Sequence, residues 1–350
     1  MRHVIVIDSF KGCLSSKEAG EAAARGILRA DPSAEVAVYP AADGGEGTLE
    51  ALPPSFRLVE CETIDPLGRS ITARYAVRGD EAMIESGEAC GLALVRTEER
   101  ACELMHTGGV GRLIKSAISR GCKVVYVALG GSVTTDGGLG MLREVGAACR
   151  DSFGNAVTEG NPLLQTEWIS LPQLDVELVL LADVDNPYAG PRGAARVFGP
   201  QKGMSPADIE RFDEALHRVG RLLGVEDEPG AGAAGGLGGA LLALGAQRRS
   251  GARFVLEESG ALEAIREADI VWTGEGRIDT QTAHGKLPAV VASCARRAIA
   301  LAGEVTDEAV LEAYSIHERD LPLQQMMDPA YAKERIERTA ERIVRGMEVD

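Results

Sequence analysis

The chain has 350 residues, enough for about two domains of ordinary size. Hydrophobic residues make up 45% of it and charged residues 26%, a balance that is typical of folded globular proteins rather than disordered ones. The net charge of −16 argues against a broad surface for nucleic acid or anionic membrane, because such a surface would repel both.

The first predicted element is a buried strand at residues 4–7, because a short run of mostly β-branched residues is typical of a parallel strand. Ser15 and Glu18 follow at the spacing of a capping box, and small or apolar residues recur at helical spacing over 19–30. A second strand is predicted at 36–39. The opening segment is therefore a β-α-β unit, for which a parallel sheet and a right-handed crossover are expected.

The middle of the chain differs from its two ends in the pattern of its apolar runs. It contains strand-like runs at residues 72–77, 82–85, 124–129 and 177–182. We interpret residues 55–264 as a second α/β domain inserted into the first, whose two halves are 1–54 and 265–350. The predicted fold is thus α/β, a split Rossmann-like parallel-sheet domain with a second α/β domain inserted.

The last part of the chain repeats the pattern of its beginning. A strand at 270–272 leads into a long glycine-containing turn, which is followed by a helix from about Pro288 and a strand at 298–302. Apolar residues recur on one helical face over 332–350, which predicts a closing helix that packs on the sheet.

The cysteines and the N-terminus indicate the compartment. The seven cysteines are odd in number, widely spread and without a CxxC pair, so neither a disulfide framework nor a zinc site is expected. No apolar run approaches the roughly 18 residues of a membrane span, and the four-residue run near the start is too short for a signal peptide. We expect a cytoplasmic protein.

Glycines gather in polar clusters that are typical of anion-binding loops, because glycine lets backbone N–H groups converge on a phosphate. The alternative for any one cluster is a simple tight turn. The clusters lie at residues 43–47, 130–138, 199–203, 229–236 and 273–279. The sequence contains neither GxxxxGK[ST] nor a GxGxxG directly after the first strand, so a P-loop or a dinucleotide fingerprint is not expected.

Carboxylates and cations accompany these glycines. Asp183 and Asp185 follow a predicted strand, where alternation puts both on one side and two carboxylates suit a magnesium site; the alternative is an Asx-turn before Asn186-Pro187. Lys11 lies between the first strand and its helix, where the helix N-terminus also favours anions. His284 is the one histidine inside a polar motif, and a catalytic role for it is a minor alternative to a structural one.

Taken together, these motifs resemble the bacterial type I glycerate kinase family, over nearly the whole chain and in the family's order. The motifs that carry the resemblance are DSFKG (8–12), PAADGGEGT (40–48), LGGSVTTDGGLGM (129–141), DVDNPYAGPRGAARVFGPQKG (183–203), PGAGAAGGLGG (229–239) and TGEGRIDTQTAHGK (273–286). The chain departs from the family pattern at Thr135, where asparagine is usual, at residues 108–113, which lack a hydroxyl and an acid, and in a short segment after Gly303.

The resemblance implies ATP-dependent phosphorylation of D-glycerate, mostly to 2-phosphoglycerate with 3-phosphoglycerate as the alternative, in organic-acid and glyoxylate catabolism. It also implies two α/β domains with the site in the cleft between them. ATP and Mg²⁺ are the expected cofactors, and the expected partners are small molecules, with no nucleic acid, no membrane and possibly a second copy of the chain. Two rivals stay open, a nicotinamide-dependent oxidoreductase and a non-enzymatic organic-acid sensor that keeps the fold.

Site residues follow from the motifs and the resemblance, because phosphoryl transfer requires positioning and charge neutralisation. The predicted catalytic residues are Lys11, Asp183 and Asp185, and the last two are also the predicted metal ligands. The predicted substrate-binding residues are Asp8, Ser9, Asp43, Gly44, Gly45, Arg277 and Asp279. The predicted nucleotide- or phosphate-binding residues are Gly131, Ser132, Asp136, Gly137, Gly138, Lys202, Gly235, Gly236 and Lys286. No general base is assigned.

Overall fold

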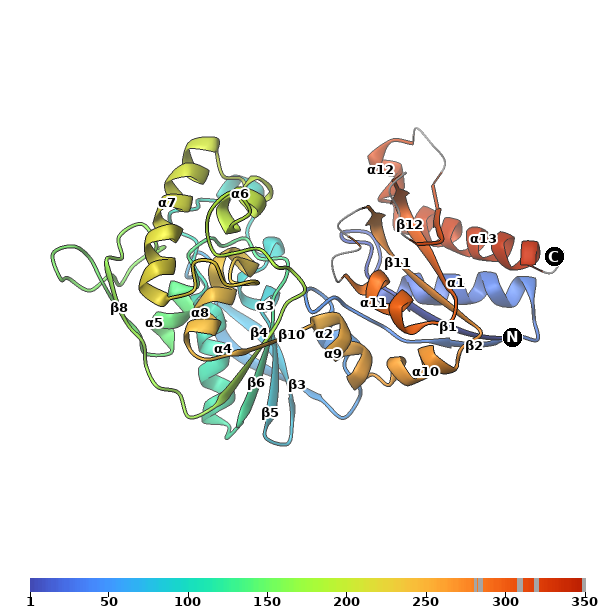
Figure 1. Ribbon diagram of the computed structural model, residues 1–350, viewed down its shortest axis with the longest axis horizontal. Helices are drawn as coiled ribbons and strands as arrows, with labels where there is room; N and C mark the ends of the chain where they lie inside the picture. The colour runs from blue at the N-terminus through green and yellow to red at the C-terminus, as the bar shows by residue number, and fades with distance from the viewer. Residues whose placement is uncertain (280–281, 283–285, 307–310, 318–320, 348–350) are drawn as a thin grey trace. The chain divides into compact units, whose positions relative to one another are not determined.

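The computed structural model (Figure 1) describes residues 1–279, 282, 286–306, 311–317 and 321–347. The chain divides into two compact units, which are Met1–Asp43, Glu50–Pro53 and Ser250–Asp350 for the first and Gly44–Leu49 with Pro54–Arg249 for the second. The predicted domain boundaries, 54/55 and 264/265, stay a prediction. The two compact units differ from the predicted domains chiefly at residues 250–264, which belong to the first unit.

The first unit is built on a parallel sheet. Within the described residues this sheet has five strands in the order β13-β12-β11-β1-β2, and every neighbouring pair is parallel. The strands are β1 (Arg2–Ile7), β2 (Glu35–Val38), β11 (Ile270–Ile278), β12 (Ala298–Val305) and β13 (Ala313–Ser315). The helices are α1 (Ser16–Ala30), α9 (Gly251–Glu258), α10 (Ala261–Glu267), α11 (Leu287–Cys294), α12 (Leu323–Met326) and α13 (Pro329–Met347), and a short helix α2 (Thr48–Ala51) lies where the chain passes between the units.

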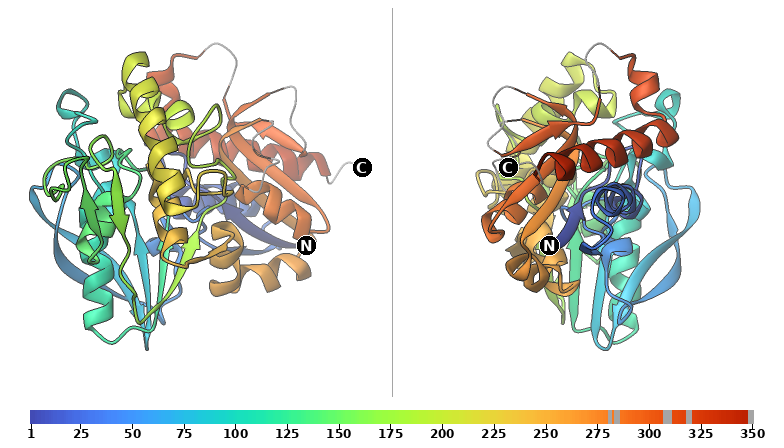
Figure 2. Two further views of the ribbon diagram at one scale, coloured as in Figure 1. Left: turned by 60° about the vertical axis from the view of Figure 1, so that its left-hand side comes forward. Right: turned by 90° about the vertical axis from the view of Figure 1, so that its right-hand side faces the viewer.

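Helices cover both faces of this sheet, as the alternation of side chains along β1 requires. Ile5 and Ile7 pack against α1 and α13, whereas Val4 and Val6 point into a separate cluster with α9, α10 and α11. The right-hand view of Figure 2 shows α13 lying next to α1. Helix α1 begins as predicted, because the Ser15 hydroxyl accepts a hydrogen bond from Glu18 N and the Glu18 side chain accepts one from Ser15 N.

The strand order reverses between β1 and β11, which makes the carboxyl ends of these strands the natural ligand site. From β1 the chain runs through α1 to β2 on one side, and from β11 it runs through α11 to β12 on the other. Connections that leave in opposite directions open a crevice at the point of reversal, outside the carboxyl ends of the two strands. The site of the first unit is expected there.

The predicted long turn after residue 272 is wrong in its first part, because β11 continues to Ile278. Residues 273–278 stay paired with β12, with Thr273 opposite Ala300 and Ile278 opposite Val305. Gly274 permits this, since a Cβ at that position would lie 2.0 Å from the Leu301 carbonyl oxygen. A glycine that looks like a turn in the sequence is here a close approach between strands.

The second unit contains a mixed six-stranded sheet in the order β10-β9-β6-β5-β4-β3. β5, β6, β9 and β10 are parallel neighbours, and β3 and β4 add an antiparallel edge. The strands are β3 (Arg57–Ile64), β4 (Ser70–Arg78), β5 (Glu81–Glu85), β6 (Val124–Ala128), β9 (Glu177–Leu181) and β10 (Gln247–Arg249), with a separate hairpin of β7 (Ala148–Arg150) and β8 (Trp168–Ser170). The helices are α3 (Gly87–Cys90), α4 (Gly108–Ser119), α5 (Leu139–Glu144), α6 (Ala194–Phe198), α7 (Pro206–Leu223) and α8 (Leu237–Ala243).

The strand runs predicted for the middle of the chain are confirmed as β4, β5, β6 and β9. β3, β10 and the β7-β8 hairpin were not predicted, because their alternating or short polar segments carry a weak periodic signal. Among the described residues no helix combines the length and the apolar character that a bilayer crossing requires. The α/β class of the chain is confirmed.

The packing of α1 on α13 leads to a stability prediction at Gly26. A Cβ there would lie 2.1 Å from the Glu337 carbonyl oxygen, so Gly26→Ala must push the two helices apart. We expect the free energy of unfolding to fall by about 1–3 kcal/mol, measured by urea denaturation. Gly346→Ala is the matched control in α13, because nothing lies within 4 Å of its Cβ position, and it should be neutral or mildly stabilising. Equal effects of the two substitutions would contradict this account.

Candidate active site

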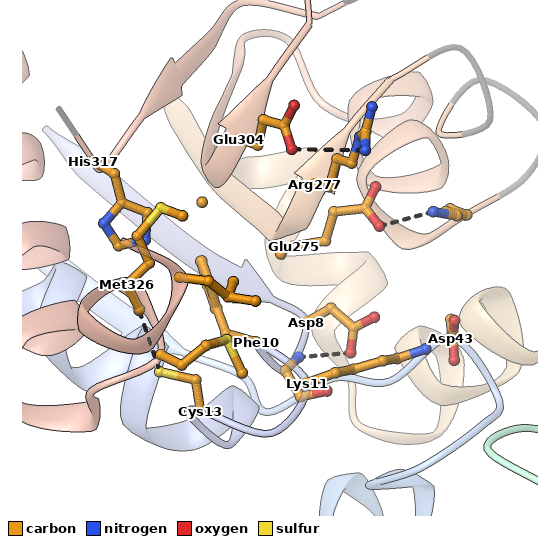
Figure 3. Close-up of a pocket in the computed structure, with 16 residues that line it drawn as sticks. Asp8, Phe10, Lys11, Cys13, Asp43, Glu275, Arg277, Glu304, His317 and Met326 are labelled. Atoms are coloured by element: carbon orange, nitrogen blue, oxygen red, sulfur yellow. Dashed lines mark hydrogen bonds and ion pairs between the residues drawn. The ribbon is translucent and has the colours of Figure 1, made fainter. Parts of the chain in front are cut away.

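A cavity of about 360 Å³ opens at the carboxyl ends of β1, β11 and β12 in the first unit (Figure 3). This volume suits a small organic acid or a phosphate group, since ligand pockets commonly range upward from about 300 Å³. The cavity is lined by Asp8, Ser9, Phe10, Lys11, Cys13, Asp43, Glu275, Gly276, Arg277, Lys286, Gly303, Glu304, His317, Leu323, Met326 and Met327. Six predicted site residues therefore meet here: Asp8, Ser9, Lys11, Asp43, Arg277 and Lys286.

The loop after β1 places Asp8 and Lys11 at the cavity. Asp8 N donates to the Gly274 carbonyl at 2.9 Å, which holds residue 8 beside β11. Phe10 and Leu14 are buried and exchange backbone hydrogen bonds, so the intervening turn projects Lys11 outward. Gly12 completes that turn at a φ of +73°, which L side chains rarely adopt. The fold of the DSFKG motif thus places the Asp8 carboxylate and the Lys11 ammonium group at the cavity.

The Asp8 carboxylate is buried in an acidic setting. Its Oδ1 accepts a hydrogen bond from Ser9 N at 2.7 Å. Burial and the charge of Asp43 raise the pKa of Asp8 to about 8, and the Ser9 N–H and Lys11 oppose this shift only in part. A carboxyl group that titrates near neutral pH inside a cleft is a candidate for proton transfer.

Glu275 forms the centre of a second polar group on β11. Thr282 Oγ1 donates to Glu275 Oε1 at 2.8 Å, and Lys286 Nζ lies 3.1 Å from Glu275 Oε2. Lys286 is the N-cap residue of α11, so the ammonium group lies at a helix N-terminus. Sequence reasoning did not select Glu275, although it lies inside the TGEGRID motif; its pairing with Lys286 depends on the fold. His284 lies outside the described residues.

Arg277 is an exposed cation of the cavity. Its side chain is 58% exposed and pairs loosely, with Asp279 Oδ2 at 3.4 Å and with Glu304 Oε2 at 3.7 Å. Long ion pairs on an exposed side chain contribute little to stability and are easily exchanged for another anion. The predicted substrate-binding residue Asp279 therefore contacts Arg277 beside the cavity rather than forming part of its wall.

The other wall of the cavity is largely apolar, and sequence reasoning missed it. Phe10, Cys13, Leu323, Met326 and Met327 line it, and the Cys13 Sγ lies 4.0 Å from the Met326 carbonyl oxygen (Figure 3). His317 also lines it and stacks on Tyr331, with ring centroids 5.8 Å apart. Burial lowers the pKa of His317, and Arg335 lowers it further. Nothing local in the sequence marks His317, Leu323, Met326 and Met327, because they come from segments remote from the motifs, whereas Phe10 lies inside the DSFKG motif.

In the second unit, Lys202 lies beside the predicted loop residues Gly131 and Ser132. The side chain is almost wholly buried, and its Nζ donates to the Thr134 carbonyl at 2.5 Å and to Ser132 Oγ at 3.2 Å. Burial lowers the pKa of Lys202 to about 8, against the opposing charges of Cys90 and Asp136. Gly131 has a φ of +60° and is exposed, and the nearest atom to its Cβ position, Glu46 Oε2, lies at an ordinary contact distance of 3.8 Å.

Asp136 acts as the scaffold of the neighbouring loop. Its buried carboxylate accepts four hydrogen bonds: Thr107 N and Thr107 Oγ1 at 2.8 Å, Gly140 N at 2.9 Å and Gly138 N at 3.0 Å. These contacts saturate the group from inside the unit. A nucleotide contact by Asp136 stays a prediction, but the structure gives the side chain a positioning role.

Four of the predicted phosphate-binding glycines pack against one another. Gly137 N donates to the Gly235 carbonyl at 3.0 Å, and Cβ atoms at Gly236 and Gly138 would lie 2.6 Å from Gly137 Cα and 2.4 Å from Ala240 Cβ. All four have positive φ angles. Close approach and turn geometry therefore explain these glycines without a ligand.

The loop that carries Gly44 and Gly45 is held within the second unit by Glu85. The Glu85 carboxylate accepts from Gly47 N at 3.2 Å and Leu49 N at 3.1 Å. Asp43 itself belongs to the first unit, so the boundary between the units falls inside the DGGEG motif. Sequence patterning did not single out Glu85, which ends β5 without a glycine cluster beside it.

Asp183 and Asp185 follow β9, as predicted. Asp183 is partly buried, whereas Asp185 is exposed and its Oδ1 lies 2.5 Å from Arg248 Nη2. Over the described part of the chain, no cluster of three or more His, Cys, Asp or Glu side chains has the arrangement of a metal site. Two carboxylates fit a magnesium ion that arrives with phosphate oxygens and waters, but not a resident ion held by protein ligands alone.

Two of the departures from the family pattern, at Thr135 and at residues 108–113, lie inside the second unit. The Thr135 hydroxyl is buried and has no hydrogen-bond partner among the described residues. Val110 is buried in the first turns of α4, within the main apolar cluster of the unit. Loss of a hydroxyl at residue 110 is thus accommodated as core packing.

Comparison with known proteins gives a consistent result over the full length. The family model described as "Glycerate kinase family" matches residues 3–348. The chain is 39% identical to the glycerate kinase of Haemophilus influenzae over 324 residues (87% of this chain, 86% of the relative) and 39% identical to the glycerate 2-kinase of Escherichia coli over 329 residues (88% and 86%). A crystal structure from Salmonella typhimurium LT2 assigned to glycerate kinase 2 superposes with a TM-score of 0.80 at 37% identity, covering 100% of this chain and 98% of that one.

Because the Asp136 carboxylate accepts four hydrogen bonds, its removal should destabilise the protein far more than removal of Asp185. We expect Asp136→Ala to lower the free energy of unfolding by about 3 kcal/mol or more, because it leaves buried N–H and O–H donors without an acceptor. Asp185→Ala removes an exposed ion pair and should change stability by less than about 1 kcal/mol. Chemical denaturation of both variants measures this. An Asp136→Ala protein as stable as wild type would show that the group is not the scaffold of its loop.

Proposed function

This chain belongs to the glycerate kinase family, and we propose that it transfers the γ-phosphoryl group of ATP to a hydroxyl of D-glycerate, with 2-phosphoglycerate as the product. The observation that carries the proposal is the cavity of the first unit. In a chain of net charge −16, the described lining residues bring together the cations Lys11, Arg277 and Lys286 around a space the size of a small organic acid. Local cations are what an acidic protein requires to bind an anionic substrate.

Arg277 is the proposed partner of the glycerate carboxylate. A planar guanidinium matches a carboxylate in two parallel hydrogen bonds, which fixes orientation better than an ammonium group does. The loose pairing of Arg277 with Asp279 and Glu304 supports this role, because a bound carboxylate replaces weak partners. Asp8, Ser9, Asp43 and Asp279 are the other proposed substrate-binding groups, together with Gly44 and Gly45.

Lys11 is the proposed charge-neutralising residue for phosphate. It extends from the loop that precedes α1, where the helix N-terminus adds to the positive potential. In the second unit, the proposed nucleotide-binding elements are the exposed backbone at Gly131, with Ser132 and Lys202 beside it. Lys286 lies in the cavity of the first unit and is proposed to act on phosphate there.

Magnesium is proposed to enter with ATP, and Asp183 and Asp185 would hold it. The ion would supply neutralisation of charge on the β- and γ-phosphate oxygens. The position of both carboxylates directly after β9 supports this assignment. The residues of the chain then serve to orient the two substrates and to balance charge.

The rival functions have less support. A nicotinamide-dependent oxidoreductase requires a glycine-rich turn after β1, where this chain has Asp8-Ser9-Phe10-Lys11. The GxGxxG-like spacing from Gly230 to Gly235 lies instead in a segment whose glycines allow close packing: a Cβ at Gly232 would lie 2.3 Å from the Pro187 carbonyl oxygen, and one at Gly235 would lie 2.0 Å from the Thr134 carbonyl oxygen. An organic-acid sensor would keep the fold without turnover. We also propose a cytoplasmic location, which agrees with the seven free cysteines. A homo-oligomer is likewise a proposal.

The proposed reaction predicts ADP release that depends on D-glycerate. With ATP and Mg²⁺, we expect a coupled assay to report turnover for D-glycerate and far less for L-glycerate, glycolate or tartronate, and ³¹P NMR to identify 2-phosphoglycerate. Binding of D-glycerate without ADP release would favour the sensor instead. NADH consumption with hydroxypyruvate would favour the oxidoreductase.

The charge assignment predicts that Lys11→Ala and Asp185→Asn each lower kcat/KM about 10²-fold, the usual effect of removing one electrostatic contact to a transferring phosphoryl group. Lys17→Ala is the matched control for Lys11, because Lys17 is an exposed side chain on α1 whose ion-pair partner among the described residues is Glu21, at 3.9 Å. Circular dichroism verifies folding. Near-normal turnover of the folded Lys11 and Asp185 variants would refute their assignment.

A further inference from the structure

We propose that Asp8 is the catalytic base of this enzyme, accepting the proton of the glycerate hydroxyl that attacks the γ-phosphorus. The inference rests on the proposed function and adds to it the group that sequence patterning left unassigned. It stands on three observations: the position of Asp8 at the strand reversal, the engagement of the neighbouring carboxylates, and the charges that surround the group.

The position of Asp8 suits proton transfer to and from a bound substrate. Asp8 follows β1 directly, at the carboxyl edge where β1 and β11 diverge, and its backbone N–H is bound to the Gly274 carbonyl. The side chain is 6% exposed, yet it lines the cavity (Figure 3). Ser9 N donates to Oδ1, and Oδ2 accepts no hydrogen bond from the described residues, so Oδ2 is available to a substrate hydroxyl. A base on a rigid strand end, buried but in contact with the cavity, meets the geometric requirement for proton transfer.

The other carboxylates of the cavity are engaged differently. Glu275 uses Oε1 for Thr282 and Oε2 for Lys286, so both of its oxygens already hold donors. Glu304 belongs to the ion-pair group of Arg277 and is highly exposed, with 61% of its side chain accessible. Asp43 is partly buried and has partners of its own. Asp8 is therefore the carboxylate best placed to exchange a proton with a bound alcohol.

The charges around Asp8 come from every element that meets at the cavity. Lys11 contributes a positive charge from the loop after β1, and Asp43 a negative one from the loop after β2. From β11 come the negative Glu275, itself paired with Lys286 of α11, and the positive Arg277; Glu304 and His317 lie farther round the wall. Burial and Asp43 dominate, and they raise the pKa of Asp8 to about 8. A base is most effective when its pKa lies near the operating pH.

The chemical step balances without another reactant. The hydroxyl oxygen of glycerate forms a bond to the γ-phosphorus while the bond from that phosphorus to the β,γ-bridging oxygen breaks and ADP leaves. The hydroxyl proton passes to Asp8 Oδ2 and then to solvent. Asp8 returns to its carboxylate form for the next turnover.

The first test is Asp8→Asn, which keeps the size of the side chain and an oxygen for the Ser9 N–H. We expect kcat to fall by about 10²–10⁴-fold, the usual contribution of a general base, with KM for D-glycerate changed far less. D-glycerate binding, measured by calorimetry, should persist. A kcat within about threefold of wild type at pH 8 would overturn the proposal.

Stability provides an independent check that Asp8→Asn is folded. The pKa of Asp8 is raised from its ordinary 3.8 to about 8, so between these values the folded state binds a proton that the unfolded state has released. Wild-type stability should therefore fall as pH rises through that window, and the asparagine variant should lose this part of the dependence. The variant is then at least as stable as wild type at pH 8. Its lost activity is thereby separated from unfolding.

The second test uses Asp43, because removing its charge should lower the pKa of Asp8. With Asp43→Asn, the acid limb of the kcat/KM profile should move to lower pH. The ratio of variant to wild type should then rise as pH falls, roughly tenfold for each pH unit of the shift, while titration of ATP cancels in the ratio. Glu304→Gln is the matched control, since Glu304 lines the same cavity but is not among the charges that shift the pKa of Asp8. An acid limb that stays in place in Asp43→Asn, or that moves equally in both, would contradict the role of Asp8.

Separate results would refute the proposed reaction and the proposed role of Asp8. If the wild-type chain does not phosphorylate D-glycerate, the proposed function is wrong. If wild type is active and Asp8→Asn is equally active, only the assignment of the base is wrong.

Discussion

The close pairing of β11 with β1 on one side and with β12 on the other is the constraint on which the first unit depends. The Asp8 N–H binds the Gly274 carbonyl, and a side chain at residue 274 would collide with the Leu301 carbonyl 2.0 Å away. Because the chain leaves β1 and β11 in opposite directions, their carboxyl ends form a crevice that no crossover helix fills. The apolar clusters on the two faces hold the strands rigid, so the groups at this edge are presented on a fixed support.

Charge compensation is the second organising theme. At the site, two cations are paired with carboxylates: Lys286 with Glu275, and Arg277 with Asp279 and Glu304. Each cation is thereby placed before a ligand arrives, and the weaker of these pairings can be exchanged for a substrate anion. Burial raises the pKa of Asp8 and the charge of Asp43 raises it further, so the acidic setting bears on proton transfer as well as on binding.

The glycine clusters serve two physical purposes that look alike in a sequence. Gly137, Gly138, Gly235 and Gly236 allow two loops of the second unit to touch, whereas Gly131 is exposed beside Lys202. Asp136 fixes the first of these loops by saturating its own oxygens. Close packing and ligand access both select glycine, and only the neighbours of each residue distinguish them.

The sequence alone determined the α/β class, the strands β1, β2, β4, β5, β6, β9 and β12, the capping box of α1 and the family, because periodicity, capping and long motifs are local properties. It also selected six residues that meet in one cavity. Only the tertiary structure decided that β11 runs on through a glycine-rich segment, that Glu275 pairs with Lys286, and that Met326 and His317 close the apolar wall. These features arise from contacts between segments far apart in the chain, and a local pattern does not record which distant backbone or side chain comes to lie beside it.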